Sequence, residues 1–210
     1  MRRAAFLASF FSVFDSIRLK RPVLSLRALF SSAVRRRLAL AALVPVLAAC
    51  SPKYEWRTLT NDDGRFSVMY PAKPALDERV LPIAGHTLKM RMQAARAGDA
   101  MFAVGSVELP SNDPALQRAV LDALESGIAR NVGIDDAPSR IQVPLTENGR
   151  YADGEALSGR GKVAGRSEHR TVEARFVAHD RRVIQAIVIS DKPVPADQVA
   201  QFLDSLRVYE

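Results

Sequence analysis

The chain has 210 residues, of which 48% are hydrophobic and 25% charged, and its 30 Lys and Arg against 23 Asp and Glu give a formal net charge of +7. Nine of the bases and one acid precede Cys50, so residues 50–210 hold 21 bases and 22 acids and are nearly neutral. A neutral domain lacks the basic surface of a nucleic-acid-binding protein, and a chain of this length after Cys50 suffices for one domain with its own core.

Residues 35–50, RRRLALAALVPVLAAC, are the most informative stretch of the chain. Three arginines precede an uncharged apolar run that ends in small residues before Cys50, the only cysteine. Basic, apolar and small-residue parts in this order are typical of an export signal. The run from Leu38 to Ala49 is too short to span a bilayer as a helix. The pattern therefore predicts a cleaved signal and not a transmembrane anchor.

The last four residues of this stretch, Leu47-Ala48-Ala49-Cys50, resemble the lipobox of bacterial lipoproteins. The resemblance implies cleavage between Ala49 and Cys50, attachment of diacylglycerol to the Cys50 thiol, and acylation of the new amino group. It further implies a lipid-anchored protein on the periplasmic side of the cell envelope, and Ser51 favours the outer membrane. Acylation also consumes a lone thiol, which is a liability in an oxidising compartment.

Residues 1–33 form an unusually long preamble to such a signal, which we interpret as an over-extended gene start with Val34 as one possible initiator. An Arg- and Ser-rich, acid-poor leader is also typical of a mitochondrial transit peptide, and this alternative stays open. A twin-arginine export signal at residues 35–38 is a weaker match. The expected organisation is a leader over residues 1–49, a lipidated tether over residues 50–53, and a single domain over residues 54–210.

The domain opens with four segments that have strand patterns. In chain order, these are Trp56–Leu59, Phe66–Tyr70, Thr87–Ala94 and Met101–Leu109. In the third segment Leu88, Met90 and Met92 alternate with charged or polar residues, which predicts a half-buried antiparallel strand. The fourth segment is more evenly apolar, so we expect it to lie nearer the centre of the sheet.

A helix is expected between Asp113, a good N-cap, and Gly133, which suits the position after the last turn. Further strands are expected at Ile141–Val143, Tyr151–Arg160, His169–Ala178 and Val183–Ser190. The last two form a predicted hairpin, and its second arm is apolar on both faces and therefore central. Pro195 opens a closing helix whose apolar stripe consists of Val199, Phe202, Leu203 and Leu206.

Strands, a helix, more strands and a closing helix predict an α+β fold, in which an antiparallel β-sheet is sandwiched by helices. The segment Asp63–Pro74, DGRFSVMYPAKP, and the segment Phe202–Leu206, FLDSL, resemble the opening strand and the terminal helix of PsbP-like domains. That family includes an extrinsic photosystem II subunit, a nuclear-transport cofactor and many bacterial envelope lipoproteins. The resemblance implies a PsbP-like fold, and a role in binding or assembly more than in catalysis.

No motif for catalysis, metal binding or a cofactor stands out. The three histidines are scattered, the serines lack a nucleophile elbow, and the aspartate pairs lie in turns without EF-hand spacing. The residues concerned are His86, His169, His179, Ser106, Ser158, Asp62-Asp63 and Asp135-Asp136. The glycine-rich segment Gly159–Gly165 has Val163 where a phosphate loop needs Ser or Thr. We therefore predict no catalytic residue, no metal and no cofactor.

The expected function is that of a monomeric, membrane-anchored, non-catalytic binding or assembly module of the cell envelope with an unidentified envelope protein partner. A small envelope hydrolase or ligand-binding protein, with a site assembled only in the fold, stays open as the alternative. Recognition is expected at Gly159–Gly165 and at the hairpin tip His179–Arg182, although a solvated basic face explains these loops as well. Their basic residues are Arg160, Lys162, Arg166, Arg181 and Arg182.

Overall fold

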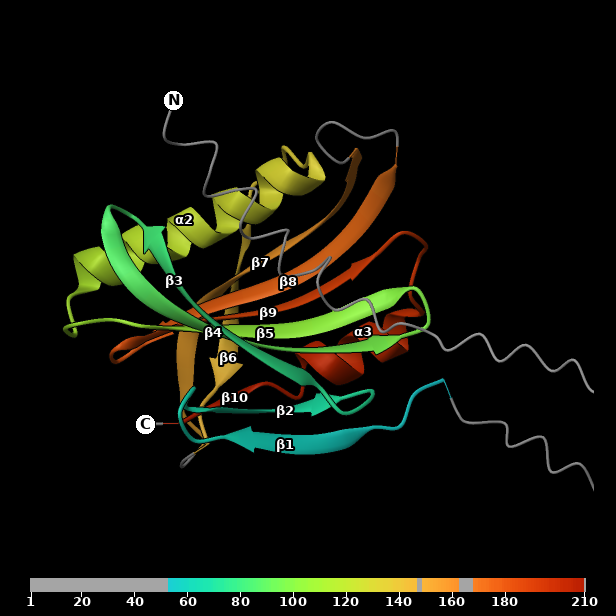
Figure 1. Ribbon diagram of the computed structural model, residues 1–210, viewed down its shortest axis with the longest axis horizontal. Coiled ribbons are helices and arrows are strands. Elements are labelled where there is room, and N and C mark those ends of the chain that lie inside the picture. Colours follow the sequence, from blue (N-terminus) through green and yellow to red (C-terminus); the bar gives the residue numbers. More distant parts are fainter. Residues whose placement is uncertain (1–52, 147–148, 163–167, 210) are drawn as a thin grey trace, which may run out of the picture.

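The computed structural model describes residues 53–146, 149–162 and 168–209, so the leader, Cys50 and Arg166 lie outside the described residues. The described chain forms two antiparallel sheets and two helices, an α+β fold (Figure 1). Its elements are β1 (Arg57–Asn61), β2 (Phe66–Tyr70), β3 (Ala75–Ile83), β4 (His86–Ala97), β5 (Ala100–Glu108), α2 (Pro114–Val132), β6 (Ser139–Pro144), β7 (Tyr151–Lys162), β8 (His169–His179), β9 (Arg182–Ser190), α3 (Ala196–Leu203) and β10 (Arg207–Val208). Neither of the described helices has the length and apolarity needed to cross a membrane.

The larger sheet has seven strands in the order β3-β4-β5-β9-β8-β7-β6. Its central strand is β9, with β5 on one side and β8 on the other. The predicted hairpin is confirmed, because β8 and β9 pair from Thr171 opposite Ser190 to His179 opposite Arg182. The central places of β5 and β9 match the evenly apolar patterns of both segments.

Helix α2 covers one face of the larger sheet (Figure 1). The Asp113 side chain accepts a hydrogen bond from the Ala115 amide at 3.0 Å, and Gly133 ends the helix with a left-handed φ of 73°. Both ends lie where the capping residues predict them. The helix buries an apolar stripe against the strands, made of Leu116, Val120, Leu121, Leu124, Ile128 and Val132.

The opposite face carries a second layer, made of α3 and a three-stranded sheet in the order β1-β2-β10. Phe66, Val68 and Tyr70 of β2 are buried in this layer. The larger sheet therefore lies between one helix on each face, as expected. The sequence does not predict that β1 and β2 pair with β10 in a separate sheet and not with the strands of the larger sheet.

An aromatic cluster attaches α3 to the rest of the second layer. The Tyr54 and Trp56 rings stack at 5.8 Å, and Trp56 and Phe202 each meet the Phe102 ring edge-on, at 5.9 and 5.4 Å. The Trp56 indole also donates a hydrogen bond to the Gln198 side chain of α3 at 3.1 Å. The first described residues of the domain and its last helix are thereby held together.

Two details differ from the sequence predictions. Strand β3 is not predicted, because it lies at the sheet edge and buries only Leu81 and Ile83 among mostly charged or exposed residues. Helix α3 ends at Leu203, so Leu206 is not part of its stripe. Leu206 is nonetheless buried, because the chain turns after Asp204 and enters β10, which pairs with β2.

Candidate functional site

A groove of about 480 Å³ lies between α3 and the strands β8 and β9; we name it the α3 groove. Its floor consists of Thr171, Glu173 and Arg175 of β8 with Val188 and Ser190 of β9. Its wall is formed by α3 and the segment before it, through Pro193, Val194, Ala196, Val199, Ala200, Leu203 and Asp204. The volume falls within the range of small-molecule sites, which are mostly apolar with a few polar groups.

Strand alternation explains the chemistry of the floor. Glu173 and Arg175 lie on one face of β8. Val172 and Ala174, which alternate with them along the strand, point into the core beneath α2. Glu173 is opposite Val188 of β9 in the strand register. The outward face of β8 is polar, and it forms the floor of a groove because α3 packs across part of that face.

The Arg175 side chain binds the C-terminal end of α3. Its guanidinium donates a hydrogen bond to the backbone carbonyl of Leu203 at 2.9 Å and forms an ion pair with Asp204. These contacts satisfy carbonyl and carboxylate acceptors at the end of the helix, where a positive charge is favourable. The charges of Arg175 and Asp204 therefore compensate each other.

Glu173 differs from Arg175, because its carboxyl has no ion-pair or hydrogen-bond partner among the described residues. Burial raises the pKa of the Glu173 carboxyl above its usual value, and no neighbouring base opposes that shift. A partly buried carboxyl without a partner, beside an apolar wall, favours a ligand that brings a positive charge or a hydrogen-bond donor. Glu173 is therefore the lining residue most able to bind a polar or charged group of a ligand.

A second cleft, of about 550 Å³, lies between the β1–β2 turn and the strands β3 and β4. It contains the predicted turn residues Asp62 and Asp63. Its Glu78 pairs with Lys89 at 2.8 Å and with Arg91 at 2.7 Å, and these hydrogen bonds lower the Glu78 pKa. No group of three or more possible metal-binding side chains occurs in the described part of the chain.

A third cleft, of about 470 Å³, includes Arg181 and Arg182 of the predicted recognition loop. Arg182 pairs with Glu108 at 3.2 Å, which lowers the pKa of that carboxyl, and the Arg181 side chain donates to the Leu109 carbonyl at 3.1 Å. The Leu109 amide in turn donates to the Arg181 carbonyl. These arginines fasten the β8–β9 turn to the end of β5.

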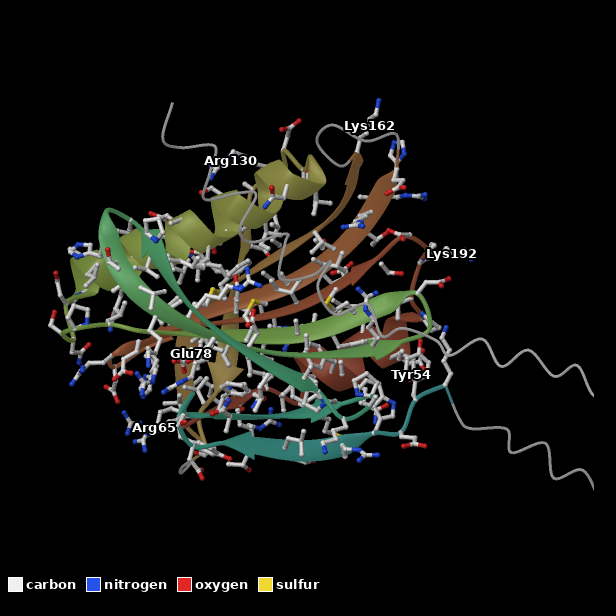
Figure 2. The ribbon with its side chains drawn as sticks, viewed as in Figure 1. Tyr54, Arg65, Glu78, Arg130, Lys162 and Lys192 are labelled. Carbon is white, nitrogen blue, oxygen red and sulfur yellow. The ribbon has the colours of Figure 1, made fainter. Side chains whose placement is uncertain are left out.

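The five predicted basic residues do not come together on one surface. Lys162 is opposite His169 at one end of β8, and Arg182 is opposite His179 at the other end. Arg160 and Lys162 are exposed, and Arg160 lies beside the α3 groove, opposite Thr171, without lining it. In Figure 2, Lys162 lies far from Arg65, which shares the third cleft with Arg181 and Arg182.

The other residues considered from the sequence are scattered in the structure. Ser106 is buried and donates a hydrogen bond to the Gly64 carbonyl at 3.2 Å, while Ser158 is exposed on β7. His86 and His169 are exposed at the first positions of their strands. His179 lies 3.8 Å from Asp180 at the hairpin tip. None of these side chains lines the α3 groove.

Glu173 lies inside the predicted strand His169–Ala178, but the sequence pattern does not mark it as a site residue, because it alternates with Val172 and Ala174 as an outward-facing residue does. A polar residue on that face normally points into solvent. The decisive fact is that α3, which begins 23 residues after Glu173, packs across the same face. Nothing in the alternation of β8 predicts which part of its outer face a later helix covers.

A carboxyl pair lies away from the three clefts, between α2 and β7. Glu125 is 7% exposed and lies beside Glu155, and its buried Oε1 has no hydrogen-bond partner among the described residues. Burial, followed by the hydrogen bond and charge of Glu155, raises the pKa of Glu125 to about 8. Arg118 forms an ion pair with Glu155 and lowers the pKa of that carboxyl. Glu125 therefore keeps its proton at neutral pH, while Glu155 is ionised.

No family model matches the chain, and no curated protein matches it. A crystal structure of a protein from Bacteroides thetaiotaomicron VPI-5482 is among the solved structures that match, with 10% sequence identity and a TM-score of 0.42. The match covers 73% of this chain and 48% of that one, so this chain spans about half the length of its structural match. The assignment to the α+β class comes from the described strands and helices alone.

Proposed function

We propose that this chain is a lipid-anchored protein of the bacterial cell envelope, whose periplasm-facing domain binds a small ligand in the α3 groove without converting it chemically. The observation that carries the proposal is the groove, which joins an apolar wall to one carboxyl without a partner. This combination is typical of a ligand-binding site. It favours a small-molecule ligand over the protein partner that the sequence alone suggests.

The place of the groove supports a role at a membrane surface. The Lys53 side chain lies against Gly98, and the neighbouring Asp99 pairs with Lys192 at 3.1 Å, next to Pro193 of the groove wall. Figure 2 labels Tyr54 and Lys192 at the same end of the molecule. Three peptide units from Cys50 to Lys53 reach about 10 Å at most, so an anchored domain would hold the groove near the lipid.

The finer assignments are also part of this proposal. A PsbP-like relationship is supported by one helix on each face of an antiparallel sheet, and by β2 ending at Tyr70, directly before Pro71. Resemblance to accessory proteins favours binding over catalysis, and Ser51 favours the outer membrane. The mitochondrial alternative predicts a cleaved leader and no lipid on Cys50.

Cys50→Ser is expected to release the protein from the membrane fraction or to leave its leader uncleaved. A single lipid chain gives only marginal anchoring, and the several chains of a lipoprotein make release negligible. The checks are fractionation of cells that produce each form and the intact mass of the mature wild-type protein. A mature wild-type protein with an unmodified Cys50 would exclude the lipoprotein assignment.

Ala200→Phe is expected to abolish ligand binding, because Ala200 is exposed and lines the groove, so a phenyl ring occupies the groove without replacing a core residue. Asp197→Phe is the matched control, since Asp197 is exposed on the same helix but outside the lining. Native mass spectrometry of protein released in mild detergent should detect a small molecule on wild type and on Asp197→Phe. The molecule should be missing from Ala200→Phe.

Two outcomes would contradict the proposed function. Equal occupancy of both phenylalanine variants would place the bound molecule outside the groove. Conversion of the bound molecule by the purified protein would replace binding with catalysis and revive the hydrolase alternative.

A further inference from the structure

We infer that the α3 groove selects amphipathic cations, namely molecules in which a primary ammonium group is joined to a short apolar chain, with the ammonium paired to Glu173. The inference rests on the proposed function, because it assigns a ligand class to the same groove. It follows from the charges in the lining and from the arrangement of polar floor and apolar wall.

Charge balance sets the sign of the ligand. The lining contains three ionisable side chains, Glu173, Arg175 and Asp204. Arg175 and Asp204 form an ion pair, and Arg175 also donates to the Leu203 carbonyl, so neither charge is free to bind a ligand. Glu173 leaves the groove with one uncompensated negative charge. A cation is the complementary partner, and its bond to a carboxylate is a charge-assisted hydrogen bond.

Desolvation of Glu173 makes this preference selective. Glu173 is paired with Val188 in the strand register, and its carboxyl has a raised pKa because burial disfavours its charged form. An ammonium group would restore that charged form, while an alcohol leaves the charge uncompensated and a carboxylate adds a like charge. Discrimination against anions therefore comes from repulsion as well as from the lost pairing.

The apolar part of the ligand is required by the wall. Val194, Val199, Ala200 and Leu203 face the groove, and Pro193 lies at its end toward the tether. A bare ammonium ion would leave these side chains in water, whereas each methylene attached to the ammonium removes more apolar surface from water. The groove thus fits a chain with a cationic end more closely than an inorganic cation.

Two sources supply such a molecule to the envelope: the ethanolamine headgroup of a phospholipid, and a free alkyl amine. The shared chemistry is a primary ammonium on methylene carbons, of which the ethanolamine headgroup has two before its phosphate. The position of the groove near the tether leaves both sources within reach. The test therefore includes membranes with and without phosphatidylethanolamine.

The experiment titrates three probes of equal chain length, namely hexylammonium, hexanol and hexanoate, into the full-length lipidated protein in nanodiscs, and measures binding by isothermal titration calorimetry. We expect hexylammonium to bind at least about tenfold more tightly than hexanol, a difference of about 1.4 kcal/mol. We expect hexanoate to bind most weakly. Glu173→Gln should remove the preference at pH 7, and Asp197→Asn, which makes the same charge change outside the lining, should retain it.

Acidification provides an independent check of the role of Glu173. The preference for hexylammonium over hexanol should shrink as the pH falls through the raised pKa of this carboxyl, because the neutral acid no longer attracts the ammonium. In nanodiscs that contain phosphatidylethanolamine, weaker binding of hexylammonium than in phosphatidylglycerol nanodiscs identifies the lipid headgroup as the occupant. Equal binding in both identifies a free amine.

The outcomes separate this inference from the proposed function. Equal affinities of wild type for hexylammonium and hexanol, or a preference that survives Glu173→Gln, would overturn the ligand class while leaving the groove as a binding site. Binding of all probes that survives Ala200→Phe would remove the groove itself. That result would end both proposals.

Discussion

Phe202→Ala is expected to lower the free energy of unfolding by about 3–5 kcal/mol, the usual cost of deleting a fully buried phenylalanine ring. The Phe202 side chain is 0% exposed, and its ring lies 5.4 Å from Phe102 and 5.6 Å from Tyr70. Domains are typically stable by about 5–15 kcal/mol, so this one ring holds a large share of the total. Urea unfolding followed by circular dichroism measures the loss.

Val199→Ala on the same helix is the comparison, because Val199 is only half-buried and should cost clearly less. Phe202→Ala should also weaken ligand binding, since α3 forms the wall of the α3 groove. A measured loss below about 1 kcal/mol would show that the cavity left by the ring collapses at little cost, which would contradict the role of Phe202 as the anchor of α3.

Glu125→Gln is expected to stabilise the protein by up to about 4 kcal/mol at pH 8 and to leave its stability unchanged at pH 4. The glutamine amide replaces the protonated carboxyl as hydrogen-bond donor to Glu155 and carries no charge to bury. Wild type must either keep a proton on Glu125 or bury its charge above the pKa of an exposed glutamate, and both states cost free energy.

The sign follows from proton binding in the two states. The folded pKa of Glu125 is about 8, against 4.5 for an unperturbed glutamate, so between these values the folded protein holds a proton that the unfolded chain has lost. The contribution of Glu125 to stability therefore falls as the pH rises from about 4.5 to about 8, and then levels off. Glu155 acts in a lower window, because its pKa is lowered and its contribution disappears only under acidic conditions.

Urea unfolding at pH 4, 6 and 8 tests this expectation. The stability of Glu125→Gln should depend less on pH than that of wild type over this range, and the difference between the two should grow with pH. Parallel pH profiles would contradict a raised pKa of Glu125.

The sequence patterns predict the core elements of the fold, because the spacing of their apolar residues matches the face that each element buries. The apolar stripe of α2 and the evenly apolar strands β5 and β9 lie where they are expected. Strand β4 runs three residues beyond the predicted end at Ala94. Beyond this point Ala95 and Ala97 are buried on the opposite face, under the second layer, so the alternation continues with its burial reversed.

The site is less predictable than the fold, because it depends on contacts between segments far apart in the chain. Glu173 is an ordinary outward residue of β8 until α3 packs beside it. In the sequence, Arg181 and Arg182 suggest a binding loop. In the structure both arginines bind Glu108 or Leu109, more than 70 residues earlier, and so stabilise the fold. Charge in a loop cannot distinguish these two uses.

The aromatic cluster also determines how the domain responds to mechanical force. A pull on the chain before Lys53 first reaches the stacked rings of Tyr54 and Trp56, and then α3 through the bond from Trp56 to Gln198. The Glu55 amide also donates a hydrogen bond to the Pro71 carbonyl at 2.8 Å, so a backbone bond shares this load before β1 begins at Arg57. The cluster therefore links the chain before Lys53 to α3, so tension on that chain acts on the helix that forms the wall of the α3 groove.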